Sequence, residues 1–440
     1  MILISSCHTL ARWLNNSGRA FRAYYAYSKM KASLSCLAIR VAFRAVGVLA
    51  VFGLSARAAP VTIRAATVFD GRGGVLHNTT ITIDGSKIVR IEPSGATRVD
   101  FDLGNATLMP GWIDTHIHLV SHFNGKGRAD SSAESTTEFI LRVEGTAWET
   151  LQAGFTTVQS LGAESDKVVR DLINSGVVPG PRVLTSLTAL TDKSGTPEEI
   201  RVKVKKLVAS GADEIKIFAT KSSRDGGAQS MTDAQIQAAC SEARALSRRV
   251  AVHAHAASGA KAAILAGCNS IEHGTFLTDD VLDLMVQRGI YFNPNLANIP
   301  NYLEHKPAYQ GIGNFTPEGF AEMAKDLPIR IDTLQRAMAK KIMIVFGTDA
   351  VAGLHGHNAE EFILRVRDAG QPAMDALISA TSRAAASIGM SDKIGAIAEG
   401  MEADLVATDD NPLADILAVR KVVFVMKGGV VYKNLPPASR

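Results

Sequence analysis

Apolar and polar positions follow one pattern near both ends of the chain and another pattern between them. Close to the start, short runs rich in β-branched residues predict strands, VTIRAATVFDG and TTITIDGSKIVRIEP, and Asp84-Gly85 is a hairpin signal. Near the end, ADLVATDDNP and VVFVMKGGVVYK repeat this pattern, with a turn at Gly428-Gly429. We therefore expect a small β-sandwich domain built from both ends, residues 59–107 plus 395–440.

Between the two ends, short strand-like runs alternate with stretches of helical spacing such as TDAQIQAACSEARALS and GAKAAILAG. The strand-like runs are GWIDTHIHL, FTTVQSL, RVLTSLTAL, EIKIFAT, VAVHAHA, SIEHG, YFNPNL and IMIVFGTDA. Such alternation predicts an α/β fold with parallel strands and crossover helices. Eight units over residues 108–390 fit a (β/α)₈ TIM barrel, which typically needs about 250 residues. We assign residues 108–394 to this barrel, with a doubly wound open sheet as the alternative.

Polar side chains at the ends of these strands favour the barrel over the open sheet. In a barrel, functional side chains gather where strands end, and residues i and i+2 of a strand share a face. Two pairs of histidines fit this rule, His116 with His118 and His253 with His255. Other strands add Lys216, His273 and Asp349. Neutral imidazole and carboxylate are good ligands for Zn²⁺ and similar ions. The pattern therefore predicts a metal site at the barrel mouth.

Lys216 is the one charged residue inside the apolar part of EIKIFAT, and a buried, unpaired ammonium group is costly. Two interpretations stay open. The amine either pairs with a nearby acid, Asp213 or Glu214, or reacts with carbon dioxide to give a carbamate. The carbamate is an anion with two oxygens that could bridge two cations.

The charge of the whole chain, +4, comes from the segment that spans residues 1–58. This segment contains eight Lys and Arg residues and no acid, so the remainder has 39 basic and 43 acidic residues. A mildly acidic protein without a basic patch is not expected to bind nucleic acid.

The same segment, residues 1–58, resembles a targeting signal. A basic region is followed by the short apolar run AVGVLAVFGL and by Ala56-Arg57-Ala58, which fits a cleavage site. We expect export to the periplasm or medium after cleavage near Ala58-Ala59, with Met30 as an alternative start and an uncleaved anchor as the competing interpretation. The run is too short to span a bilayer, so we expect no stable membrane partner. After cleavage only Cys240 and Cys268 remain, and we interpret them as buried free thiols.

Taken in order, several motifs resemble those of the amidohydrolase superfamily, in its imidazolonepropionase-like and Xaa-Pro dipeptidase-like branch. They are MPGWIDTHIHL, EIKIFAT, VAVHAHAASGAKAAILAGCNSIEHG, FGTDA and the tail ALISATSRAAASIGM with KIGAIAEGMEADLVATDDNPL. Each motif alone is of moderate specificity, but the ordered set is highly specific. The resemblance covers nearly the whole chain after the targeting segment.

The resemblance implies a site with two divalent metal ions, of which Zn²⁺ is the best single candidate. His116, His118 and Asp349 would hold one ion, His253 and His273 the other, and N6-carboxylated Lys216 would bridge them. A hydroxide shared by the metals would be the nucleophile, and Asp349 would carry its proton to the leaving amine. The spacing between the fifth-strand ligand and the sixth-strand histidine in related sequences selects His253. His255 would then contact substrate or support a ligand.

The resemblance further implies hydrolysis of an amide bond in a small molecule, a dipeptide or an N-acyl amino acid. Candidates for binding the substrate are His255, His355 in GLHGHNAEEF, and Lys221 and Arg224 in ATKSSRDGGAQSMT, a loop that departs from many relatives. Alternatives are a cyclic-amide hydrolase, a non-catalytic metal-binding protein and a deaminase. Deaminases usually carry Glu three residues after the fifth-strand histidine, where this chain has Ala256 or Ser258. A homo-oligomer is compatible with the sequence, which does not specify the substrate.

Overall fold

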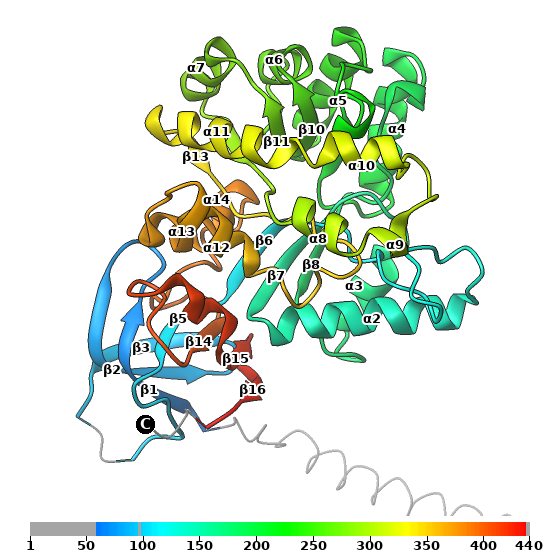
Figure 1. The fold of residues 1–440 in the computed structure, drawn as a ribbon. Helices are drawn as coiled ribbons and strands as arrows, with labels where there is room; N and C mark the ends of the chain where they lie inside the picture. The colour runs from blue at the N-terminus through cyan, green and yellow to red at the C-terminus, as the bar shows by residue number, and fades with distance from the viewer. Residues whose placement is uncertain (1–58, 96–97, 437–440) are drawn as a thin grey trace, which may run out of the picture. The chain divides into compact units, whose positions relative to one another are not determined.

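The computed structural model describes residues 59–95 and 98–436. Strands from both ends of this part of the chain join in one mixed sheet (Figure 1). The sheet order is β16-β15-β14-β5-β1-β2-β3, and β4 pairs with β1. Its strands are β1 (Val61–Phe69), β2 (Val75–Asp84), β3 (Lys87–Pro93), β4 (Phe101–Asp102), β5 (Thr107–Pro110), β14 (Leu405–Thr408), β15 (Val422–Lys427) and β16 (Val430–Asn434).

The two predicted hairpins are present in this sheet. Gly85 turns β2 into β3 at φ 60°, and Gly428 and Gly429 turn β15 into β16 at φ 55° and 78°, which is backbone that glycine adopts without a steric penalty. The pairing that unites the two ends is antiparallel, between β5 and β14. One face of the sheet buries Ile63, Leu108 and other apolar side chains. The sandwich arrangement and the domain boundaries at residues 107 and 395 stay predictions.

All eight predicted inner strands occur, and they pair in parallel, so the α/β class is confirmed. One sheet has the order β6-β7-β8 and the other β13-β12-β11-β10-β9. Their strands are β6 (Trp112–Ile117), β7 (Phe155–Ser160), β8 (Arg182–Thr185), β9 (Ile215–Phe218), β10 (Val250–Ala256), β11 (Ser270–Phe276), β12 (Tyr291–Asn293) and β13 (Met343–Ile344). Two isolated parallel bridges, Leu190 with Ile217 and Ile117 with Ala350, link the edges of these sheets.

Helices connect the parallel strands. They are α2 (Thr136–Gln152), α3 (Asp166–Asn174), α4 (Pro197–Ala209), α5 (Asp233–Ala245), α6 (Ala257–Leu265), α7 (Asp279–Arg288) and α11 (Asp326–Ala339). After β13 follow α12 (Glu360–Ile363), the π-helical segment η3 (Leu364–Asp368), α13 (Ala373–Ser379) and α14 (Ser382–Ser387). Short 3-10 helices are η1 (Asp192–Ser194), η2 (Ser223–Asp225) and η4 (Ile416–Arg420). Capping boxes at Thr196 and Thr232 begin α4 and α5, because each threonine and the residue three positions later satisfy each other's free backbone N–H groups.

An excursion of three short helices separates β12 from α11: α8 (Asn298–Glu304), α9 (Lys306–Tyr309) and α10 (Pro317–Met323). Its aromatic side chains pack together, with the rings of Tyr302 and Tyr309 4.9 Å apart and those of Tyr302 and Phe315 5.0 Å apart. This cluster is separate from the main core between strands and helices. It fixes the excursion above the carboxyl ends of the strands, where α8 contributes to the site described below.

Cys240 and Cys268 form a disulfide, so the interpretation as free thiols is wrong. Cys240 lies on α5 and Cys268 just before β11, and both are buried. The pairing depends on the packing of α5 against α6, which brings the two Cα atoms to 5.3 Å. A separation of 28 residues in the sequence gives no hint of that proximity.

The predicted targeting segment, residues 1–58, lies outside the described residues. Within the part of the chain that the structure describes, the helices are too short or too polar to cross a membrane.

We expect that the protein beginning at Ala59 releases no titratable thiol when it is denatured without reductant, and two after reduction. Cys240→Ala should lower the free energy of unfolding by roughly 3–4 kcal/mol, because the disulfide closes a loop of intermediate length in the unfolded chain. Thiol titration and thermal unfolding measure the two effects. Two reactive thiols in the unreduced, denatured protein would contradict the disulfide.

Candidate metal centre and active site

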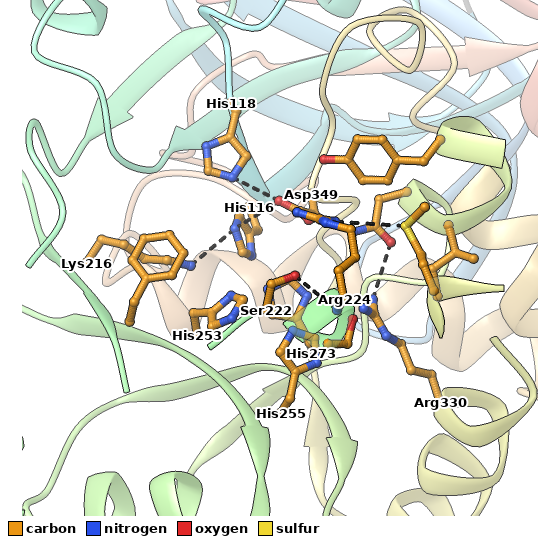
Figure 2. A pocket seen from close by; sticks show the side chains of 16 residues that line it. His116, His118, Lys216, Ser222, Arg224, His253, His255, His273, Arg330 and Asp349 are labelled. Carbon is orange, nitrogen blue, oxygen red and sulfur yellow. Dashed lines mark hydrogen bonds and ion pairs between the residues drawn. The ribbon is translucent and has the colours of Figure 1, made fainter. Parts of the chain in front are cut away.

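Two groups of potential metal ligands face each other at the carboxyl ends of the parallel strands (Figure 2). The first group is His116, His118 and Asp349, and the second is His253, His255 and His273. Within each group the nitrogen and oxygen atoms lie within 4.8 Å of one another. The structure therefore brings together all the histidines and the aspartate that the strand-end pattern predicts.

In the first group, Asp349 connects the two histidines. Its Oδ1 lies 2.9 Å from His118 Nε2 and 3.3 Å from His116 Nε2. Asp349 follows β13 with a left-handed backbone, φ 55°, and His273 on β11 has φ 70°. Non-glycine residues in this region cost of order 1–3 kcal/mol each and concentrate at functional sites.

Lys216 lies beside the first group, fully buried, with Nζ 3.2 Å from His116 Nε2. The two acids considered as partners of Lys216, Asp213 and Glu214, form no ion pair with it among the described residues. Asp213 accepts a hydrogen bond from Arg170 at 2.7 Å instead. Burial raises the pKa of Glu214 well above its usual value, which favours its neutral form. Burial also lowers the pKa of Lys216, although Glu272 and Asp349 oppose this shift. A neutral amine is the form that reacts with carbon dioxide.

The buried histidines are suited to act as neutral ligands. Burial is the largest cause that lowers the pKa of His116, His253, His255 and His273, and nearby positive charges add to it. Nδ1 of His273 is buried and has no hydrogen-bond partner among the described residues. A neutral imidazole with an unused nitrogen can accept a metal ion.

Glu272 is a site residue that the strand pattern did not identify. His116 Nδ1 donates to its Oε2 at 2.9 Å, and Ser270 Oγ donates to its Oε1 at 2.5 Å. This bond holds the ring so that Nε2 faces Asp349 and Lys216, as carboxylates commonly do behind ligating histidines. Burial disfavours the charged form of Glu272, but the contacts with His116 and Lys216 outweigh it and lower the pKa.

Asp114 links β6 to the segment that carries Asp349. It accepts hydrogen bonds from the hydroxyl of Thr348 at 2.7 Å and from the amide of Asn358 at 2.8 Å. Burial raises its pKa to about 7, although these hydrogen bonds favour the charged form. The network fixes the position of Asp349 from behind.

The two groups line a cavity of about 190 Å³. Besides the histidines, Lys216 and Asp349, its walls are Phe218, Ser222, Ser223, Arg224, Asn298, Ile299, Tyr302, Met323 and Arg330. Of the side chains predicted to bind substrate, His255 and Arg224 line this cavity. Lys221 is exposed and does not line it, and its carbonyl lies 3.4 Å from His253 Nε2. His355 is buried away from it, beside a different hollow with Glu149 and Arg420.

Arg224 and Arg330 bring two guanidinium groups to the same cavity as the histidines (Figure 2). Arg224 lies over the ring of Phe315, 4.1 Å from its centroid, and its Nε donates to Asn314 Oδ1 at 2.9 Å. Arg330, on α11, is 3 % exposed, and its Nη1 donates to the carbonyl of Asn295 at 2.7 Å. An arginine within an amphipathic helix resembles a surface residue, so the sequence did not single out Arg330.

The sequence pattern did not identify Asn298, at the start of α8, as a site residue either. It is 4 % exposed, and its Nδ2 donates to Asp349 Oδ2 at 2.5 Å. The excursion after β12 therefore supplies one wall of the cavity and a direct contact to a candidate ligand. Strand-end patterns cannot reveal such residues.

Residues 107–432 match the model of the amidohydrolase family. The chain belongs to this family and is a hydrolase that acts on amide bonds.

Three relatives show which members of the family this chain is similar to. Over 380 aligned residues, the chain is 29% identical to an ochratoxinase of Aspergillus niger, and the match covers 74% of this chain and 76% of the relative. A solved Xaa-Pro dipeptidase with methionine bound in its active site is 32% identical, with a TM-score of 0.78, over 86% of this chain and 100% of that one. A prolidase complexed with N-methylphosphonate-L-proline is 25% identical, with a TM-score of 0.77 and the same coverage.

We expect Glu272→Gln to weaken metal binding by roughly 10- to 100-fold, because the charge that orients and polarises His116 is lost. Titration of metal-free protein with Zn²⁺ against a chelator of known affinity measures this. Glu242→Gln, on α5 away from the cavity, serves as the control and should bind like the wild type. Equal affinities for all three proteins would remove the supporting role of Glu272.

Proposed function

We propose that the protein is a binuclear metal-dependent amidohydrolase that releases the C-terminal amino acid from a dipeptide or an N-acyl amino acid. The observation that supports this most directly is the composition of one cavity. Two groups of metal ligands flank the buried Lys216, and two guanidinium groups line the same cavity. A substrate with an amide bond and a carboxylate close to it is complementary to such a cavity.

The residues present fit two divalent ions. Asp349 with His116 and His118 would hold one, and His253 with His273 the other; the unpartnered Nδ1 of His273 supports a ligand role. Addition of carbon dioxide to the Lys216 amine, with loss of a proton, would give a carbamate whose two oxygens serve both ions. Zn²⁺ suits this mixture of imidazole and carboxylate.

His255 is proposed to contact substrate instead of a metal ion. Its Nδ1 lies 2.8 Å from Thr275 Oγ1, and its ring stacks on that of His273 at 4.9 Å. Both contacts hold the ring at the edge of the second group while Nε2 stays available to the cavity.

Divalent ions bound here would polarise the amide carbonyl and lower the pKa of a water molecule. Asp349 would accept the proton of that water and return it to the nitrogen of the leaving amino acid. Oδ2 of Asp349 is held by Asn298, so the carboxylate keeps one orientation during both transfers.

Arg224 and Arg330 are proposed to bind the substrate carboxylate. Nε of Arg224 is occupied by Asn314, and the ring of Phe315 supports the flat face of the guanidinium. At the outer edge, Nη1 makes only a weak contact within the described chain, with Met323 Sδ at 3.9 Å, which an anion could replace. Beside Ser222, Ser223 and Asn298, the wall includes four apolar or aromatic side chains, those of Phe218, Ile299, Tyr302 and Met323. We therefore expect substrates with apolar side chains.

A cyclic amide is the second candidate, and the two arginines would have a role in its hydrolysis only if the ring carries a carboxylate. Deamination is disfavoured by Ala256 and Ser258 at the positions where deaminases usually carry glutamate. A binding protein without catalysis is less consistent with an aspartate poised beside the ligands.

The remaining proposals concern architecture and location. The bridges at Leu190 and Ala350 support closure of the eight parallel strands into a (β/α)₈ barrel over residues 108–394, with a β-sandwich from residues 59–107 and 395–440. The Cys240–Cys268 disulfide supports export into an oxidising compartment, after cleavage near Ala58-Ala59.

Metal content tests the binuclear site. We expect about two Zn²⁺ per chain in protein prepared with bicarbonate, and well below two in Lys216→Ala, because the bridging anion is lost. Elemental mass spectrometry measures this, and chelation should abolish hydrolysis until metal is restored. One ion in both proteins would contradict the bridging role of Lys216.

Substrate pairs test the carboxylate site. Wild type should hydrolyse an N-acyl amino acid faster than the matching amino-acid amide. Arg224→Gln should lower kcat/KM for the acid by roughly 10- to 100-fold, the loss expected for a charge-assisted hydrogen bond, and leave the amide nearly unchanged. Arg288→Gln on the exposed part of α7 is the control. Equal rates for acid and amide in wild type would favour a cyclic or neutral substrate.

A further inference from the structure

A short hydrogen-bonded chain runs from the carboxylate-binding wall to Asp349. Nη1 of Arg330 donates to Asn298 Oδ1 at 3.3 Å, and Asn298 Nδ2 donates to Asp349 Oδ2 at 2.5 Å. The three side chains belong to residues that are at most 9 % exposed. The contact between the two sides of the cavity is therefore direct and largely shielded from water.

The amide of Asn298 is suited to this position because it offers an acceptor and a donor at opposite corners. A guanidinium on one side requires the acceptor, and a carboxylate on the other requires the donor. The two neighbours thus specify one orientation of the amide. Aspartate would place a second negative charge against Asp349, and an apolar residue would satisfy neither neighbour.

Asp349 depends on this contact for its orientation. Its Oδ1 is directed at His116 and His118, whereas its Oδ2 is held by Asn298. The residue sits in left-handed backbone at the end of a strand, φ 55°. Without Asn298, Oδ2 would lose its hydrogen-bond donor, and the orientation of the carboxylate would depend on the contacts of Oδ1 with the two histidines alone.

Within the described chain, Arg330 is held by hydrogen bonds at Nε and Nη1, whereas its Nη2 makes only a long ion pair. Nη1 also donates to the Asn295 carbonyl, and Nε donates to Thr275 Oγ1 at 3.1 Å, the same hydroxyl that contacts His255. Among the described residues, the nearest charged partner of Nη2 is Asp326, 4.0 Å away. An anion bound at Nη2 would tighten the position of Nη1 against Asn298.

We propose that Asn298 is a positioning residue that couples binding of the substrate carboxylate at Arg330 to the orientation of Asp349. A free carboxylate then raises the rate of bond cleavage and not only the affinity for substrate. This inference rests on the proposed amide hydrolysis and assigns the residue that makes the reaction selective for acids.

The test compares kcat and KM for an N-acyl amino acid and its amide in wild type and in Asn298→Leu, which has a similar volume and no hydrogen bonds. In wild type the acid should show the higher kcat. In the variant, kcat for the acid should fall by roughly 10- to 100-fold, as expected when a hydrogen bond to a charged group is lost. Its KM should change by less than about threefold, and acid and amide should then have similar kcat values.

A double variant separates coupling from simple damage. Arg330→Met should raise KM and lower kcat for the acid. Asn298→Leu with Arg330→Met should have a kcat no lower than the poorer single variant, because both changes break one chain. Multiplicative losses would overturn the coupling.

Metal content and wild-type activity keep the outcomes distinct. Asn298→Leu should retain the metal content of wild type, and Asn298→Ala replaces it if the leucine variant does not fold. An unchanged kcat, or an acid that keeps its advantage in kcat without Asn298, would overturn this inference while the proposed function stands. Wild-type protein that hydrolyses neither compound would instead reject the proposed function.

Discussion

The complete burial of the Lys216 side chain, without a carboxylate paired to it among the described residues, is the constraint on which the site depends. An ammonium group in that environment would carry a large desolvation cost, and the neighbouring histidines are themselves held neutral by burial. The carbamate proposed for Lys216 would remove this cost, because its negative charge would be neutralised by the metal ions proposed to bind beside it.

Much of this site could be predicted because parallel strands impose a simple rule. Residues two apart share a face, and strand ends converge, so the pairs at His116 and at His253 could be placed together from spacing alone. The rule fails at Glu272. It should alternate with His273, but the left-handed backbone of His273 breaks the alternation and lets both side chains reach the interior.

Asn298 and Arg330 could not be predicted in this way. Asn298 begins α8 in the excursion after β12, and Arg330 lies on α11, the helix that follows it. The placement of the excursion depends on packing among Tyr302, Tyr309 and Phe315. His355 and Lys221 show the reverse error: they follow strands in the expected loops, but local backbone turns direct them away from the cavity. The strands thus supply the groups expected to bind metal, whereas Asn298 and Arg330 come from helices after β12.

The pairing of β5 with β14 has a consequence for how the protein is made. Synthesis delivers β1 to β5 first, but β5 stays an open edge until β14 emerges, after all the parallel strands and the helices between them. The first sheet therefore cannot be completed on the ribosome before nearly the whole chain has been translated. A protein whose first and last strands pair in one sheet leaves that sheet incomplete for most of its synthesis.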